Sequence, residues 1–159
     1  MADSTLKSPK AALEISDEIS VLTFGGSMMP LLRQHRDMVV IKRVDRAFKK
    51  GDVVLYPGKN DTFTLHRIMR IKKDGLIIRG DNNYFTERDI KESDIIGIMK
   101  EFYREGKYIN CETDFNYKLY TFYICHSYYL RYLWRKIVFP FLCKVKNKIF
   151  PNWHILKRK

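Results

Sequence analysis

The sequence has no acidic residue after Asp114, although residues 115–159 carry ten lysine and arginine side chains. The net charge of +12 is therefore uneven, and residues 1–114 hold only +2 of it. A nearly neutral body followed by a basic segment is the organisation this pattern predicts. The total charge alone is not evidence for a nucleic-acid-binding protein.

Cysteine motifs and metal-ligand spacings are also missing. The three cysteines are odd in number, widely spaced and without a C-x-x-C pair, so we expect them to be reduced and structural. The glycine pair of "GGS" lacks the G-K-[ST] end of a phosphate-binding loop. We therefore predict no metal and no cofactor. The residues concerned are Cys111, Cys125 and Cys143, with His35, His126 and His154.

Long apolar runs are absent as well. The start, "MADSTLKSPKAALEIS", has no apolar core of a secretory signal or membrane anchor. Residues 119–130 are apolar and aromatic but too short for a bilayer core of about 30 Å, and Pro140 interrupts the next apolar run. The sequence thus predicts a cytoplasmic or peripherally membrane-associated protein with no full transmembrane helix.

Short extended runs separated by turn residues fill the body. They predict a mainly β domain, partly rolled into a barrel, with one short helix over Met28–Leu32. We expect a polar N-terminal arm at 1–18, the sheet domain at 19–110 and a basic, aromatic, helical C-terminal segment at 111–159. We also expect the body to fold without the residues after Asp114. The predicted strands are 20–24, 37–44, 52–56, 62–71, 75–80 and 94–103.

Ser27 stands in "FGGSMMPLL", between two glycines and a proline. One interpretation is a helix N-cap, whose hydroxyl accepts from the second or third helical N–H. The third of these positions is Pro30, which has no N–H. The cap is then half satisfied, and the hydroxyl is partly free to do chemistry.

Two further groups complete a possible constellation. His66 lies in the strand "TFTLHRIMRI", where a histidine is usually structural, and Asp81 lies in "RGDNN", which is typical of a turn. Together with Ser27 they are a hydroxyl, an imidazole and a carboxylate on one sheet. An imidazole can take the proton of a serine at neutral pH, and a carboxylate can fix its tautomer.

Three ordered blocks resemble the type I signal peptidase family and its relatives, the self-cleaving SOS repressors. They are "GGSMMPLL" with "RDMVVI", then "KKGDVVLY", then "LHRIMRI" leading to "IIRGDNN", and they spread from about Thr23 to Gly97. The resemblance implies a signal-peptidase-like rolled sheet. The set of blocks in this order is more specific than any one of them.

The resemblance also implies roles for individual residues. Ser27 would attack the peptide carbonyl, and its own N–H, with Gly26 allowing close approach, would hold the oxyanion. Histidine before G-D-N-N is typical of the eukaryotic, archaeal and sporulation-type branch, which makes His66 the general base instead of a lysine. Asp81 and Glu87 would be orienting or structural acids, with Asp89 just beyond Glu87.

The sequence departs from the family at two places near the nucleophile. Gly25 stands where a serine that assists the oxyanion is common, and loss of such a donor costs about 10²-fold in rate where it is used. Arg36 stands where glycine is common.

The predicted function is a serine endopeptidase that cleaves leader or signal-like peptides, with a peptide or protein as its substrate. Two alternatives remain: a non-catalytic membrane-associated adaptor that keeps the fold, and a self-cleaving regulator. For the regulator, the 26 residues before Ser27 are too few to hold a helix-turn-helix module. For residues 115–159 the alternatives are a helix packed on the body and an interfacial segment on anionic lipid. Nucleic acid is not expected as a partner.

Overall fold

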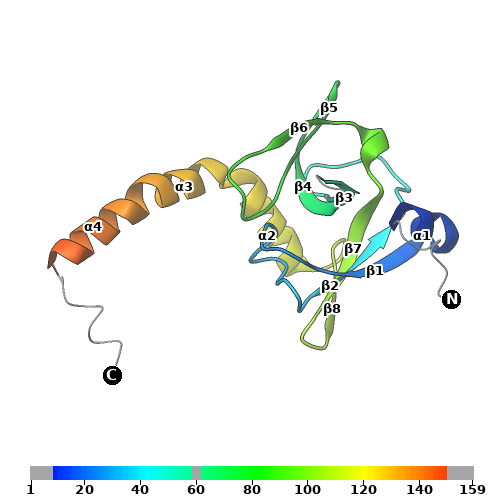
Figure 1. Cartoon of the computed structure of the whole chain (residues 1–159), viewed down its shortest axis with the longest axis horizontal. Helices are drawn as coiled ribbons and strands as arrows, with labels where there is room; N and C mark the ends of the chain where they lie inside the picture. The colour runs from blue at the N-terminus through cyan, green and yellow to red at the C-terminus, as the bar shows by residue number, and fades with distance from the viewer. Residues whose placement is uncertain (1–8, 59–61, 150–159) are drawn as a thin grey trace. The chain divides into compact units, whose positions relative to one another are not determined.

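Eight antiparallel strands form one sheet that curls into a half-barrel (Figure 1). The computed structural model describes residues 9–58 and 62–149. The strand order is β1-β2-β7-β3-β4-β5-β6, with β8 paired to β7. The strands are β1 Glu18–Leu22, β2 Met38–Lys42, β3 Val53–Pro57, β4 Phe63–Lys72, β5 Gly75–Arg79, β6 Glu87–Ile90, β7 Gly97–Arg104 and β8 Lys107–Asn110.

The prediction of a mainly β protein is confirmed, and a strand occurs in each of the six predicted runs. Strands β6 and β8 were not predicted. Each has only four residues, and β6 is the charged sequence "ERDI", whose side chains give no apolar alternation. Helix α1, Pro9–Ser16, occupies part of the predicted polar arm and buries Leu13, whereas residues 1–8 lie outside the described residues.

The short helix predicted after Ser27 is wrong. Residues 27–31 form turns, held by hydrogen bonds from Met29 N–H to the Gly26 carbonyl and from Leu32 N–H to the Met28 carbonyl. Pro30 has no N–H with which to continue a ladder of helical bonds, so the turns do not propagate into a helix. The Met29–Pro30 peptide bond is cis.

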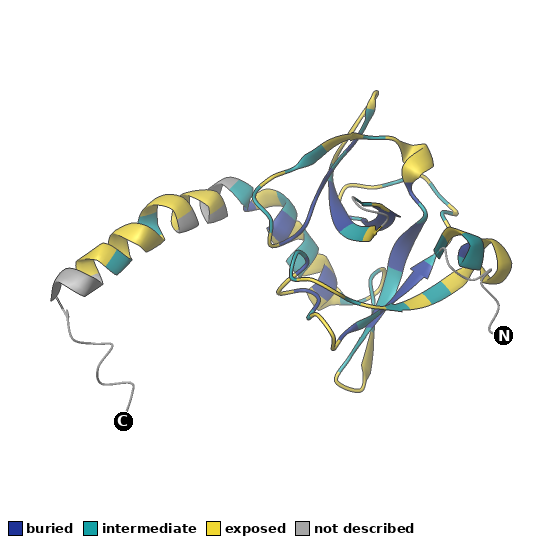
Figure 2. Cartoon of the chain, viewed as in Figure 1, coloured by how far each residue is buried: buried dark blue, intermediate teal, exposed yellow. Residues whose placement is uncertain are grey.

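Apolar side chains from both faces of the curled sheet form the core. The buried residues lie mainly in the strands of the sheet (Figure 2). One cluster joins α1 and the Ser27 turns to strands β2, β3 and β7. The other lies between β3, β4, β5 and the segment before β7. Leu55 and Val54, neighbours in β3, belong to the first and second cluster respectively, as the two-residue period of a strand requires.

Helix α2, Phe115–His126, packs on this body through one face. It begins where the Asp114 side chain accepts a hydrogen bond from the Tyr117 N–H at 2.7 Å, which is N-capping geometry. Gly51, with φ of +100°, allows the close approach, because a Cβ there would lie 2.8 Å from Thr121 Cγ2. The first compact unit therefore extends to Cys125, beyond the predicted boundary at 111 and beyond the predicted end of the body near Asp114.

The second compact unit begins at His126. Its described part is α3 Tyr128–Leu133, a π-helical stretch Trp134–Val138 and α4 Phe139–Ile149. The wider π-helical turn ends at Val138, two residues before Pro140, which cannot donate an intrahelical bond, and the helical run continues through the proline. Within the described residues, no helix has both the length and the apolar character needed to span a membrane.

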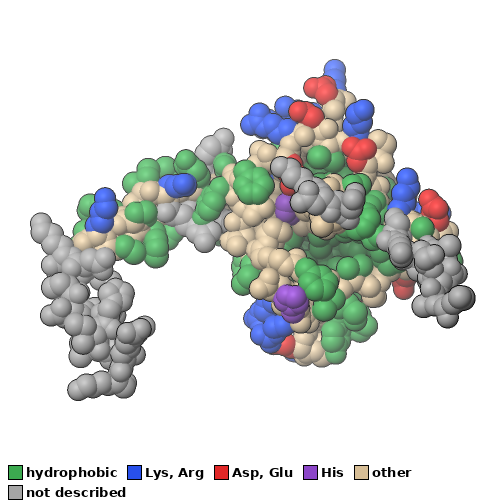
Figure 3. All heavy atoms as spheres, viewed as in Figure 1, with side chains coloured by type: hydrophobic (Ala, Val, Ile, Leu, Met, Phe, Trp, Pro, Cys, Tyr) green, Lys and Arg blue, Asp and Glu red, His purple; other side chains and the backbone are tan. Residues whose placement is uncertain are grey.

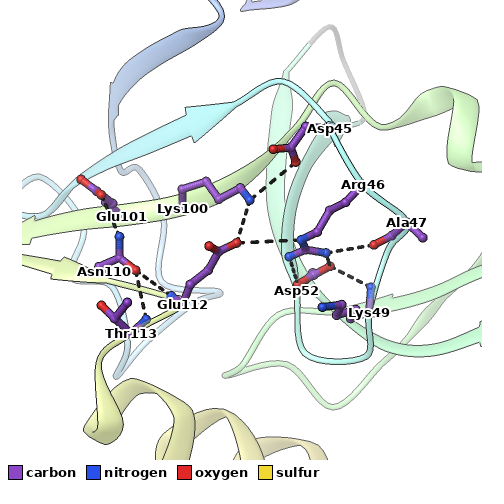
Figure 4. A network of polar contacts seen from close by, with 10 residues as sticks. All are labelled: Asp45, Arg46, Ala47, Lys49, Asp52, Lys100, Glu101, Asn110, Glu112 and Thr113. Carbon is purple, nitrogen blue, oxygen red and sulfur yellow. Dashed lines mark hydrogen bonds and ion pairs between the residues drawn. The ribbon is translucent and has the colours of Figure 1, made fainter.

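A polar network fixes the loop that leads into β3 (Figure 4). Arg46 bonds both carboxylate oxygens of Asp52 at 2.8 and 2.9 Å, and Lys100 of β7 lies 2.7 Å from Glu112. Asp52 also caps the turn by accepting the Lys49 N–H at 2.8 Å. Strand β3 thus starts from a rigid corner, which sets the position of the side chains farther along it.

Candidate active site

Strand β4 carries His66 and Arg67 next to each other, so they point to opposite faces of the sheet. Both side chains are buried, at 4% and 0% exposure respectively. A buried imidazole and a buried guanidinium each need polar partners, since an unpaired buried polar group is costly. Their partners therefore define the site.

The Nδ1 atom of His66 faces a pair of oxygens. It lies 3.0 Å from Glu87 Oε1 and 2.9 Å from the Tyr56 hydroxyl, which itself donates to Glu87 Oε1 at 2.8 Å. Tyr56 pairs with Thr64 and His66 with Val54, so Tyr56 and His66 are diagonal neighbours on one face of the sheet. Strand β6 brings Glu87 to them.

This arrangement selects one tautomer of the imidazole. The single hydroxyl proton of Tyr56 goes to Glu87, and a carboxylate can only accept, so Nδ1 of His66 must carry the ring proton. Burial and the neighbouring Glu87 raise the pKa of Tyr56, which keeps that proton on the phenol. The other ring nitrogen, Nε2, is then an unprotonated acceptor.

Burial also acts on the protonation of His66 itself. It lowers the pKa of His66 below the ordinary 6.5, and the charge of Glu87 offsets this only in part. The imidazole is therefore neutral at pH 7, as a general base must be.

The Nε2 side of His66 meets the Ser27 turn across Gly80. A Cβ built on Gly80 would lie 2.9 Å from His66 Nε2 and 2.7 Å from the Ser27 carbonyl oxygen, so both atoms reach the same point. The Asn82 N–H donates to the Ser27 carbonyl at 2.8 Å, and the Asn82 side chain donates to the Gly26 carbonyl at 3.1 Å. The loop after β5 thus fixes the Ser27 backbone beside the imidazole.

The donors of Ser27 are not used within the described residues. Neither its hydroxyl nor its backbone N–H makes a hydrogen bond there, and the Gly26 N–H also donates none. In particular, Ser27 and His66 do not share a hydrogen bond, although such bonds are often longer in proteins without a bound substrate. The structure brings the two residues together and leaves the hydroxyl free to turn.

Asp37 anchors the far end of the same loop. It accepts the Arg33 N–H at 2.9 Å and the Arg104 guanidinium at 2.6 Å, and Arg104 also bonds the Leu31 carbonyl. Burial opposes ionisation, but the bonds from Arg104 and Arg33 outweigh it and hold the pKa of Asp37 below its ordinary value. Residues 27–37 are therefore held at both ends without a helix.

Asp81 has a different partner from Glu87. Its two carboxylate oxygens accept from Nε and Nη2 of Arg67, both at 2.8 Å, and the Tyr120 hydroxyl adds a third bond at 3.2 Å. Asp89 is exposed in the edge strand β6, with φ of +61°. Of the three acids considered, the structure places the carboxylate of Glu87 on His66 Nδ1.

The partly buried Cys111 and Cys125 do not offer a competing nucleophile. Burial raises the pKa of Cys111 to about 12 and raises that of Cys125 as well, so neither is a thiolate at neutral pH.

An apolar cavity of about 490 Å³ opens beside Ser27. It lies between the edge strand β1 and the first residues of β4, which pair with β3 on one side but pair with β5 only from Arg67 onward. Among the residues that the structure describes, two stretches of strand edge without a pairing strand therefore flank the cavity. Its lining includes Val21, Leu22, Met28, Phe63 and Leu65.

Comparison with known proteins adds no assignment: no family model matches the chain, and no curated protein matches it significantly.

Tyr56 is the residue of this site that the sequence did not reveal. Its position in "DVVLY" fits a core residue, and an apolar run with one tyrosine carries no sign of a hydroxyl partner. One signal could have found it. Tyr56 and His66 lie in the consecutive predicted strands 52–56 and 62–71, which pair as β3 and β4 and place these residues diagonally opposite, and such pairs contact each other.

We expect Gly80→Ala to disturb the site, because the new methyl group would overlap backbone atoms of the Ser27 turn. Overpacking of this kind costs about 1–3 kcal/mol. Hydrogen exchange of residues 24–32 should speed up, and the denaturation midpoint should fall. Gly26→Ala is the control, since the nearest atom to its Cβ is Met29 Sδ at 3.8 Å; equal effects of the two variants would contradict the close contact at Gly80.

We expect Asp81→Asn to lower the free energy of unfolding by about 3–5 kcal/mol, because it leaves the charge of Arg67 buried and unpaired. Chemical denaturation measures this change. Glu105→Gln, which breaks the exposed pair with Arg33, should cost no more than about 1 kcal/mol. If Asp81→Asn is as stable as Glu105→Gln, the buried pair does not hold the site together.

Proposed function

We propose that this protein is a serine endopeptidase of the signal-peptidase type, which cleaves leader or signal-like peptides through an acyl-enzyme on Ser27. The observation that carries the proposal is the orientation of His66. Its protonated Nδ1 is held by Glu87 and Tyr56, and its free Nε2 faces the Ser27 turn across Gly80. This is the arrangement in which a histidine can activate a serine.

The proposed reaction uses side chains and water alone. The Ser27 hydroxyl turns toward His66, gives its proton to Nε2 and attacks the peptide carbonyl. Glu87 stabilises the imidazolium that forms, and the unused N–H of Ser27 donates to the oxyanion. His66 then protonates the leaving amine, and a water molecule activated by the same nitrogen releases the acyl group.

Tyr56 is a positioning residue in this scheme. By donating to Glu87 it fixes the carboxylate against Nδ1, and it also shields this side of the imidazole from other hydrogen-bond donors. Glu87 is one-third exposed, so without the phenol its carboxylate could turn toward water.

The cavity beside Ser27 fits an extended peptide with small or apolar side chains. Its walls are aliphatic and aromatic, and the unpaired edges of β1 and of residues 63–66 can pair with a peptide backbone. A folded or strongly charged segment would bury unpaired polar groups there. The proposed substrate is therefore an unstructured, uncharged stretch of a leader peptide.

The direct test is covalent labelling by an electrophilic peptide that acylates serine, followed as a mass increase of the intact chain. Wild type should gain one adduct, mapped to Ser27. Ser27→Ala should gain none, and His66→Ala should slow labelling by about 10²- to 10⁴-fold, the usual contribution of a general base.

Ser20→Ala serves as the control, because Ser20 lies in β1 and makes no hydrogen bond through its side chain within the described residues. It should label like wild type. Labelling that persists in Ser27→Ala, or no labelling of a folded wild type by any such peptide, would contradict catalysis and favour a non-catalytic adaptor.

The pH dependence of labelling should follow the low pKa of His66. The rate falls as His66 is protonated, and burial places this midpoint below 6.5, so wild type should keep more than half of its maximal rate at pH 6.5. Glu87→Gln removes the charge that raises the pKa of His66. Its midpoint should move further to acid pH, while its maximal rate drops because the imidazolium loses its counter-charge.

Tyr56→Phe is the matched control for charge, because it removes the hydroxyl and keeps the carboxylate of Glu87. Its midpoint should move less toward acid pH than that of Glu87→Gln, because the carboxylate keeps its charge near the imidazole even where it turns toward water. A midpoint for Glu87→Gln that moves to higher pH, or that does not move, would show that Glu87 is not the partner of the titrating group.

A further inference from the structure

The C-terminal unit exposes a long apolar stripe. Leu133, Ile137, Phe141 and Val145 follow one another at intervals of four residues along the helix of residues 128–149. All four are exposed, and Ile137 and Phe141 expose 60% and 63% of their surface. Side chains four residues apart lie on one side of a helix, so they form a continuous row.

Tryptophan and tyrosine accompany this row. Trp134 and Tyr132 are exposed at 55% and 40%, and Phe139 and Leu142 are exposed as well. Figure 3 shows hydrophobic side chains along the described helical part of the C-terminal unit. Such a helix leaves much apolar surface in water. Soluble proteins seldom keep an apolar patch of this extent without a partner.

Helix α2 repeats the pattern in the first unit. Phe115, Leu119 and Phe122 are exposed at helical spacing, whereas Tyr117 and Ile124 on another side of the helix are buried. The exposed side is therefore not required for packing on the sheet. Both units carry apolar helical surface of the same kind.

The charge of the C-terminal unit indicates what covers this surface. Residues 126–159 have nine lysine and arginine side chains and no aspartate or glutamate. Within the helix itself the basic residues stand between the apolar ones in sequence. A lysine stem can extend along apolar surface while its charge stays in water. Lys136 and Lys144 are exposed.

We propose that the helix of residues 128–149 lies along the surface of an anionic lipid bilayer, with the row from Leu133 to Val145 inserted below the headgroups. Aromatic residues at headgroup depth, aliphatic residues beneath them and basic residues on phosphate are what such an interface accommodates. The helix is about 33 Å long at 1.5 Å per residue. Its exposed Lys136 and Lys144 would hold it in the plane of the surface.

Other occupants fit less well. Two copies of the helix would bring like charges together without an acidic partner on either side. Nucleic acid would meet the basic residues and stack on aromatic rings, but it offers nothing to an aliphatic row such as Leu133, Ile137 and Val145. Of these three occupants, an anionic lipid surface is the one that satisfies both the charge and the aliphatic side chains.

The test is co-sedimentation of the intact chain with phosphatidylcholine vesicles, with and without phosphatidylserine. Binding should require phosphatidylserine. Raising the salt from about 0.1 M to about 1 M shortens the screening length from about 10 Å to about 3 Å, so it should release most but not all of the protein. The apolar contact persists at high salt.

Two variants separate the apolar and charged contributions. The double variant Ile137→Ser, Phe141→Ser should weaken binding about tenfold or more, whereas Ile15→Ser, which changes an exposed residue of α1, should not. Likewise Lys136→Glu with Lys144→Glu should abolish the preference for phosphatidylserine, and Lys107→Glu on the β8 hairpin should leave it unchanged. Circular dichroism verifies that each variant keeps its helix content.

Fluorescence reports the depth of insertion. In a Trp153→Phe background, the emission of Trp134 should shift to the blue on phosphatidylserine vesicles. Absence of binding to these vesicles would overturn the proposal. So would binding that the stripe and charge variants leave intact, or a lipid-free dimer in sedimentation velocity that Ile137→Ser, Phe141→Ser dissociates. None of these outcomes bears on labelling of Ser27, so this proposal and the peptidase proposal fail separately.

Discussion

The buried ion pair of Arg67 and Asp81 is the interaction on which the rest of the site depends. Moving two charges out of water is expensive, and the pair is tolerated only because every face of the guanidinium is satisfied. Asp81 takes two of its donors, and the Gly51 carbonyl, Tyr117 hydroxyl and Thr121 hydroxyl accept from Nη1 at 2.8, 3.3 and 3.0 Å. Three segments outside β4 therefore meet at the side chain of Arg67.

This ion pair also fixes the backbone of His66 and Gly80, whose neighbours in sequence, Arg67 and Asp81, form the pair. Arg67 follows His66 directly, so fixing the guanidinium fixes the backbone that carries the imidazole. Asp81 follows Gly80 directly, so the same bond fixes the backbone that touches Ser27 and His66 Nε2. Pre-organised donors and acceptors of this kind need little rearrangement when charge develops.

Much of the fold could be predicted from sequence because strands and turns show patterns among residues that are close in sequence. The alternation in β4 and the turn residues between strands depend only on near neighbours, and so does the placement of His66 and Arg67 on opposite faces. The short strand β6 was missed because four mostly polar residues at a sheet edge become a strand only through pairing with β5. The Ser27 turns were expected to be a helix because their anchors, Asn82 and Arg104, are remote in sequence.

The same reasoning explains which residue roles in the site could not be predicted from the sequence. The sequence could identify Asp81 and Glu87 as candidate acids but could not tell which of them contacts His66. That depends on the face of the sheet to which each carboxylate is brought by the fold. The role of Tyr56 could not be predicted for a related reason. A tyrosine in an apolar strand is ordinary, and only the approach of β6 from 31 residues away turns its hydroxyl into a functional group.

Helix α2 has a consequence for how such a protein can change over evolutionary time. Its Tyr117 and Thr121 complete the coordination of Arg67, while the same helix continues to His126, where the C-terminal unit starts. The sheet therefore cannot be inherited as a free-standing module that ends with its last strand. A recombination event that exchanges the C-terminal unit for another can be tolerated only if its junction falls after Cys125. Each unit can change the partners that it contacts. Substitutions in helix α2 are constrained by both units, because the helix completes the Arg67 site and ends at the first residue of the C-terminal unit.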